Sequence, residues 1–245
     1  YPIPGTRWQA MHLNAARGGG ARSLNDGTLT AQPSATAATL PYAAVTSLPT
    51  ATDPYTTAVV AGAGAKTVFE YFPFLTQLTL MEPLGLTWTT PALTRDILMV
   101  GPAALEVRIA SVLPEADIHA VITDVWPDGS AHPVSAGRLR SSYPNLIEEK
   151  SRHDTQGNMV QPYTDYSTKS YATPGVARDY HVEFWPIGNL FQTGHRLRLY
   201  LVGAPTYSVP APGINLVSIG GDAPARLLLP LPPGNDLCAA IGASC

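Results

Sequence analysis

Apolar and polar side chains alternate along much of the second half of the chain. In the stretch AALEVRIASV, Leu105, Val107 and Ile109 share one face. The same alternation recurs in residues 117–125, 177–187 and 194–203, and an apolar run covers residues 225–232. A period of two residues is typical of β-strands. Because no run has apolar residues at helical spacing over a dozen positions, the pattern predicts little helix.

Turn signals separate these strands. The motif PDG places Asp128 and Gly129 in a tight turn, which predicts a hairpin. Pro and Gly contribute 24 and 21 of the 245 residues, which favours short strands joined by turns. About eight strands with long crossovers predict an all-β fold, a jelly-roll β-sandwich. In this sandwich Arg196, Arg198 and Tyr200 lie opposite a row of leucines, and we expect them to face solvent or a partner.

The first part of the chain shows little periodicity. Residues 7–13, RWQAMHL, form the only clear strand in a region rich in Gly, Ala, Ser and Thr. We therefore expect an irregular N-terminal segment over residues 1–80 that packs on the sandwich or on a neighbouring domain. Residues 81–235 are expected to form the sandwich, and residues 236–245 a C-terminal tail.

Charge and hydropathy exclude two classes of partner. The formal net charge is −3, and no basic face is visible that could neutralise a phosphate backbone. No stretch reaches the ~18 uninterrupted apolar residues of a membrane span. The sequence therefore predicts neither nucleic acid nor a membrane as a partner.

Catalytic and metal-binding signals are weak. A serine hydrolase of the α/β type carries its nucleophile in a G-x-S-x-G turn, and this sequence has none. Asp117, His119 and Asp124 could offer metal ligands on one strand, but alternation explains Asp117, His119 and Val121 better as an outward face. We predict no catalytic, cofactor or metal residue, which leaves open whether the chain acts as an enzyme.

Cysteine and aromatic positions leave alternatives open. Cys238 and Cys245 fit either a disulfide in an oxidising compartment or two idle thiols, and a disulfide would favour an extracellular or cell-envelope location. Tyr163, Tyr166 and Tyr171 lie in a polar, aperiodic excursion. They are candidates for a ligand surface, although rings of this kind also cover sheet edges or contact other domains.

Several motifs occur in an order that points to a known family. They are Asp124 and Asp128-Gly129 around the hairpin, Gly137 to Arg140 after it, and Gly194-His195-Arg196 before the last long alternating strand. Over roughly residues 80–232 the chain resembles the C-terminal domain of X-prolyl dipeptidyl-peptidase and cocaine-esterase-like (CocE/NonD) serine hydrolases. The resemblance implies a galactose-binding-domain-like jelly roll attached to an α/β-hydrolase domain.

In that family the catalytic triad belongs to the α/β-hydrolase domain, so the resemblance implies a non-catalytic chain whose partner is the catalytic domain of the same parent. The parent would act on ester or X-Pro peptide bonds. This chain would add stability, interdomain contacts, or part of a substrate entrance or homo-oligomer interface. His195 would then make a structural hydrogen bond. The alternative is a secreted β-sandwich module that binds carbohydrate or another ligand.

Overall fold

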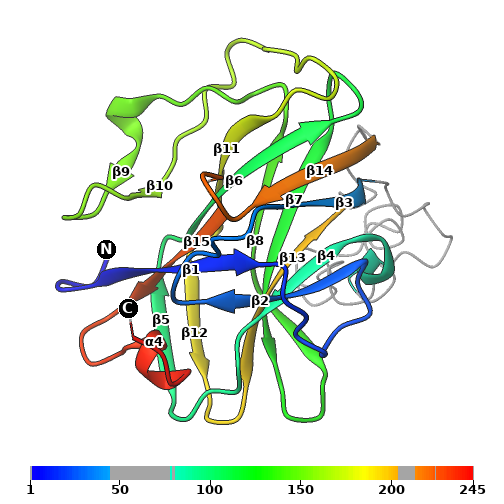
Figure 1. Ribbon diagram of the computed structural model, residues 1–245. Helices are drawn as coiled ribbons and strands as arrows, with labels where there is room; N and C mark the ends of the chain where they lie inside the picture. The colour runs from blue at the N-terminus through cyan, green and yellow to red at the C-terminus, as the bar shows by residue number, and fades with distance from the viewer. Residues whose placement is uncertain (1, 45–77, 79–80, 204–212, 224, 245) are drawn as a thin grey trace, which may run out of the picture.

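The computed structural model describes residues 2–44, 78, 81–203, 213–223 and 225–244. Nearly all regular structure in this part of the chain is β-strand, arranged as a β-sandwich, which confirms the predicted fold class (Figure 1). The jelly-roll connectivity stays a prediction.

In chain order the strands are β1 (Arg7–Asn14), β2 (Asn25–Thr30), β3 (Ala38–Ala44), β4 (Leu86–Thr89), β5 (Ile97–Gly101), β6 (Ala104–Ser111), β7 (Asp117–Val125), β8 (Ala131–Arg140), β9 (Arg152–His153), β10 (Met159–Gln161), β11 (Arg178–Glu183), β12 (Ile187–Phe191), β13 (Arg196–Val202), β14 (Gly213–Ile219) and β15 (Ala225–Leu231). Short helical turns are η1 (Glu82–Leu84), η2 (Glu148–Lys150) and α4 (Leu237–Ala240).

One large sheet forms most of the molecule. Its strands follow the order β3-β14-β6-β15-β1-β2-β4-β13-β7-β8, and β11 branches from it by pairing with β6. The pairs are antiparallel except for β2 and β4, which run parallel. Two small sheets, β12-β5 and β10-β9, complete the described strands. The order shows that strands far apart in sequence are neighbours, as crossover connections require.

The large sheet curls back on itself. Its edge strand β8 meets the end of β11 through a bridge between Gly137 and Phe184. Next to this bridge, the backbone N–H of Trp185 donates to the carbonyl oxygen of Ala136 at 3.0 Å. Because β11 itself pairs with β6, this contact brings two distant parts of the sheet together. The curled sheet therefore encloses a core between facing layers.

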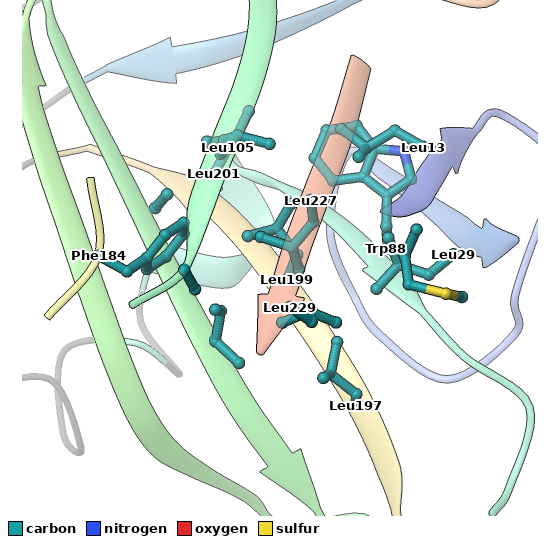
Figure 2. Packing of buried hydrophobic residues seen from close by; sticks show 14 of the residues in the cluster. Leu13, Leu29, Trp88, Leu105, Phe184, Leu197, Leu199, Leu201, Leu227 and Leu229 are labelled. Carbon is teal, nitrogen blue, oxygen red and sulfur yellow. The ribbon is translucent and has the colours of Figure 1, made fainter. Parts of the chain in front are cut away.

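The main core is a large aliphatic and aromatic cluster between these layers. Figure 2 shows Leu197, Leu199 and Leu201 of β13 pointing into it together with Leu227 of β15 and Leu105 of β6. All of them are fully buried. Full burial of a leucine stabilises the fold by about 1.5–3 kcal/mol, so this face of β13 is a main source of stability.

The opposite face of β13 is covered as well, which corrects one prediction from the sequence. Arg196 is exposed as expected, but Arg198 and Tyr200 retain only 3% and 1% of their accessible surface. Leu78 and Met81 pack with Tyr200 in a second buried cluster. The expectation of solvent exposure was wrong for these two residues because segments from earlier in the chain lie over β13.

The interpretation of Asp117, His119 and Val121 as an outward face is also wrong. All nine residues of β7 are buried. β7 is paired on one side with β13 and on the other with β8, and Val121 belongs to the same second cluster as Tyr200. Alternation predicts the inner face of such a strand, but it does not show whether the outer face is covered.

The N-terminal segment is more regular than the sequence predicts. Beyond β1, it supplies β2 and β3, which pair with β4 and β14. Both strands were missed because their own alternation is weak, and β3 also because its partner β14 lies far along the chain, whereas β2 pairs with its neighbour β1 as well. Residues 45–77 and 79–80 of the segment lie outside the described residues, so the domain boundary near residue 80 stays a prediction.

The C-terminal residues pack against the sandwich. In α4, Leu237, Cys238 and Ala240 are buried and join the main core. The side chain of Asp236 caps the helix by accepting from the backbone N–H of Ala239 at 3.0 Å. No helix in the described ranges is long and apolar enough to cross a bilayer.

Gly137 gives a direct test of the closure between β8 and β11. A Cβ at this position would overlap the carbonyl oxygen of Glu183 and lie 2.9 Å from Val182 Cγ1. We expect Gly137→Ala to lower the free energy of unfolding by about 1–3 kcal/mol, measured by urea denaturation. Gly188→Ala on β12 is the matched control, because nothing lies within 4 Å of its added Cβ. Equal stability of the two variants would contradict the tight closure.

Candidate functional site

The residues of the GHR motif lie at the start of β13. Gly194 has a φ of +84°, in the left-handed region that favours glycine. His195 Nδ1 lies 2.9 Å from Asp124 Oδ1 on β7, and both side chains are nearly buried. Arg196 points outward and donates to the carbonyl oxygen of Thr90 at 3.3 Å. We interpret the His195–Asp124 hydrogen bond as a structural contact that holds the turn before β13 against β7.

The PDG turn joins β7 and β8. Gly129 has a φ of +87°, and Asp128 Oδ1 accepts from the backbone N–H and the hydroxyl of Ser130 at 2.9 and 2.6 Å. These hydrogen bonds from Ser130 hold the pKa of Asp128 below its ordinary value. The turn is therefore fixed by the local chemistry that its sequence predicts.

A serine and an imidazole do meet in this hairpin. Ser130 Oγ lies 2.8 Å from His132 Nε2, and the His132 ring stacks on Trp126 with centroids 4.1 Å apart. A nucleophilic serine gives its proton to the imidazole. Here the hydroxyl donates to Asp128 instead, which leaves the imidazole to donate to the serine oxygen. The arrangement fits a capped turn and does not activate a nucleophile.

Groups that could bind a metal are not assembled in the described ranges. No group of three or more His, Cys, Asp and Glu side chains is placed to hold an ion there. Asp117 instead accepts from Arg138 and Arg140 at 3.1 and 3.3 Å. His119 Nδ1 lies 3.4 Å from the carbonyl oxygen of Gly203. Asp117 is therefore engaged in ion pairs, and His119 contacts the backbone. These are two of the residues that the sequence offered as metal ligands.

The structure describes only one of the two cysteines. Cys238 is buried in α4 with 1% of its surface accessible. Cys245 lies outside the described residues, so the Cys238–Cys245 disulfide stays a prediction.

A hollow that combines polar and aromatic groups lies beside the closure of the sheet. It has a volume of about 460 Å³ and is lined by Tyr163 and Tyr166 of the polar excursion, Arg138 of β8, and Glu183 and Trp185 at the end of β11. We refer to it as the aromatic groove. Two of the three tyrosines that the sequence singled out therefore share one groove.

Tyr171 lies apart from the groove, near Lys169, whose Nζ is 5.4 Å from the centroid of its ring. Sequence reasoning missed Trp185, which is 75% exposed. The sequence did indicate that Trp185 is exposed, because it falls on the polar face of an alternating stretch and is followed by Pro186. Its proximity to Tyr163 and Tyr166 depends on long-range folding.

Comparison with known proteins gives a consistent picture. A family model described as the X-Pro dipeptidyl-peptidase C-terminal non-catalytic domain matches residues 1–212. Among solved structures, a CocE/NonD family hydrolase from Staphylococcus aureus aligns with a TM-score of 0.69 and 16% identity, over 95% of this chain and 38% of that chain. No curated protein sequence matches significantly.

Two further structures have the same fold. An aminopeptidase from the marine sediment archaeon Thaumarchaeota archaeon aligns with a TM-score of 0.67 and 16% identity, over 94% of this chain and 38% of that chain. An alpha-amino acid ester hydrolase aligns at 0.59 and 17% identity, over 91% and 36%. The chain therefore spans little more than a third of the length of the proteins that it matches.

Proposed function

This chain belongs to the family of X-Pro dipeptidyl-peptidase C-terminal non-catalytic domains, and from that premise we propose that it supports a serine-hydrolase domain of the same parent protein. Membership confirms the resemblance seen in the sequence. The parent enzyme that we propose hydrolyses ester or X-Pro peptide bonds. In it, this β-sandwich contributes stability and an interdomain contact, while the catalytic domain holds the nucleophile and base.

The match of residues 1–212 to a non-catalytic family model carries the proposal. The chain lengths of the similar solved structures support it, because those hydrolases have more than half of their chain outside the region that aligns with this one. The chemistry of the hairpin also supports it, since the hydroxyl proton of Ser130 is held by Asp128 rather than by His132.

An exposed apolar pair supports the proposed interdomain contact. Leu98 of β5 and Leu190 of β12 are direct cross-strand partners, and they are 36% and 47% exposed. The pair forms a small apolar patch, and apolar patches occur on surfaces that a partner covers. We assign this pair to the catalytic domain rather than to a second copy, because the family match implies a neighbouring domain in the parent.

The first test uses the 245-residue chain alone. We expect no hydrolysis of p-nitrophenyl acetate above the buffer background and no labelling by a fluorophosphonate, because no hydrogen bond to an imidazole activates a serine in the part of the chain that the structure describes. Ser130→Ala is the control, and it should behave as the wild type does. Turnover that disappears in Ser130→Ala would overturn the proposal, since it would make the hairpin itself the active site.

The second test addresses the parent protein. An antibody raised against this chain should precipitate, from the source cells, a polypeptide heavier than 26.0 kDa that reacts with a fluorophosphonate. If the antibody precipitates only an unlabelled species of 26.0 kDa with no labelled companion, the proposed partnership is wrong.

A further inference from the structure

The aromatic groove presents three rings to solvent. Trp185, Tyr166 and Tyr163 are 75%, 61% and 46% exposed. Single exposed aromatic residues are ordinary on protein surfaces, but three around one hollow form a patch. The volume of about 460 Å³ falls within the range of ~300–1,000 Å³ that is common for small-molecule sites. Buried Leu139 and Phe184 also line the groove and support it from below.

Hydrogen bonds hold the backbone at two of these rings, Trp185 and Tyr163. The N–H of Trp185 donates to the carbonyl oxygen of Ala136, and the carbonyl oxygen of Tyr163 accepts from the N–H of Ile147 at 2.8 Å. Rings on an anchored backbone lose little conformational freedom when a ligand covers them. The groove is therefore organised for binding before a ligand arrives.

Polar groups of both signs stand among the rings. Arg138 donates to the buried carboxylate of Asp117 at 3.1 Å, and Glu183 Oε1 accepts from Gln161 Nε2 at 3.0 Å. The guanidinium has further N–H donors, and the carboxylate has further lone pairs. The groove can thus both donate to and accept from a ligand, while the charge of Arg138 is already paired.

A second hollow of about 290 Å³ extends the groove, because Arg138 and Tyr166 line both. Its other cations, Arg140 and Lys169, pair with Glu115 at 3.8 and 3.0 Å. The extended surface therefore combines exposed rings with paired charges. It does not offer an unpaired cluster of cations for an anionic ligand.

We propose that the aromatic groove binds a neutral oligosaccharide, with sugar rings stacked on Trp185, Tyr163 and Tyr166. A sugar ring has an apolar C–H face that matches an aromatic ring, and its hydroxyl groups both donate and accept hydrogen bonds. Arg138 and Glu183 supply the complementary donor and acceptor. A neutral ligand fits because the cations are already paired. This site is separate from the proposed support of a hydrolase domain, and the two can fail independently.

The experiment is titration calorimetry of the 245-residue chain with neutral hexasaccharides of glucose, xylose, mannose and N-acetylglucosamine. We expect at least one of these to bind and Trp185→Ala to weaken that binding by about tenfold or more, because a stacked ring is lost. Tyr166→Ala should also weaken it. Trp126→Ala is the matched control, since Trp126 is also an exposed tryptophan, 46% accessible, but lies outside the groove.

Several outcomes would overturn the proposal. They are no binding of any hexasaccharide at millimolar concentration, equal loss in Trp185→Ala and Trp126→Ala, or binding of sulfated or uronic oligosaccharides only. Tight binding of decaproline in place of the sugars would assign the groove to proline-rich peptide. Loss of sugar binding in the intact parent protein would also overturn it, because another domain would then cover the groove.

Discussion

Arg198→Ala is expected to lower the free energy of unfolding by about 3–5 kcal/mol, measured by urea denaturation followed by circular dichroism. Arg198 is 3% exposed and lies on the covered face of β13. Its guanidinium donates to the hydroxyl of Thr89 at 2.8 Å, to the carbonyl oxygen of Gly20 at 2.7 Å, and to the hydroxyl of Tyr200 at 3.2 Å. Removal of the side chain leaves the buried hydroxyls of Thr89 and Tyr200, and the more exposed Gly20 carbonyl, without their donor.

Glu82 completes this network. Its Oε2 accepts from the hydroxyl of Tyr200 at 2.8 Å and lies 4.0 Å from Arg198 Nη1. Its Oε1 accepts from the backbone N–H of Arg22 at 2.6 Å. The network thus joins the loop around residue 20 and η1 to the centre of the sheet. Loss of the cation leaves the partly buried Glu82 carboxylate without its ion pair and the buried Thr89 and Tyr200 hydroxyls without a donor, which together explain the large expected effect.

Arg196→Ala is the matched control, because Arg196 lies two residues away on β13 with an exposed side chain. We expect it to cost less than about 1 kcal/mol. Glu82→Gln should destabilise on its own, and the Arg198→Ala/Glu82→Gln double variant should lose less than the sum of the single losses, because both belong to one network. An Arg198→Ala loss as small as that of Arg196→Ala would rule out the network as a source of stability.

The sequence predicts the inner half of this fold well. Leu197, Leu199 and Leu201 were placed on one face by alternation, and the structure buries all of them. Alternation is a local property that a single strand displays by itself. It cannot show that Leu78 and Met81 cover the opposite face. Burial of Arg198 and Tyr200 is therefore a consequence of topology that no period in β13 reveals.

The same limit applies to the aromatic groove. Tyr163 and Tyr166 could be chosen from the sequence because rings in a polar excursion are unusual. Alternation also places Trp185 on the polar face of its stretch. It lies near the two tyrosines, however, only because β8 and β11 close the sheet at this point. The closure requires Gly137, whose missing side chain leaves room for the Glu183 carbonyl. A site built at such a crossing needs the fold before its members can be grouped.

His119 gives the fold a weakness in acid. Burial lowers its pKa from the ordinary 6.5 to about 4, and the positive charge of Arg138 acts in the same direction. The hydrogen bond to Gly203 and the charge of Asp117 raise the pKa and offset part of this effect. The unfolded chain therefore binds a proton at this residue below pH 6.5, whereas the folded chain does so only near pH 4.

We expect the wild type to lose about 3 kcal/mol of stability through His119 as the pH falls from about 6.5 to about 4, and His119→Asn to lack that loss. Urea denaturation at intervals across this range measures how the free energy of unfolding changes with pH in each protein. A destabilisation by the substitution that is the same at every pH does not affect this slope.

Other titrating groups do not disturb the comparison. The lowered pKa of partly buried His12 acts in the same sense in both proteins and cancels. Carboxylates with lowered pKa values, such as Asp236 and Glu115, lose their contribution as the pH falls below their ordinary values of 3.8 and 4.5, and this loss is the same in both proteins, so it cancels as well. Parallel slopes for wild type and His119→Asn would show that His119 titrates normally in the folded protein.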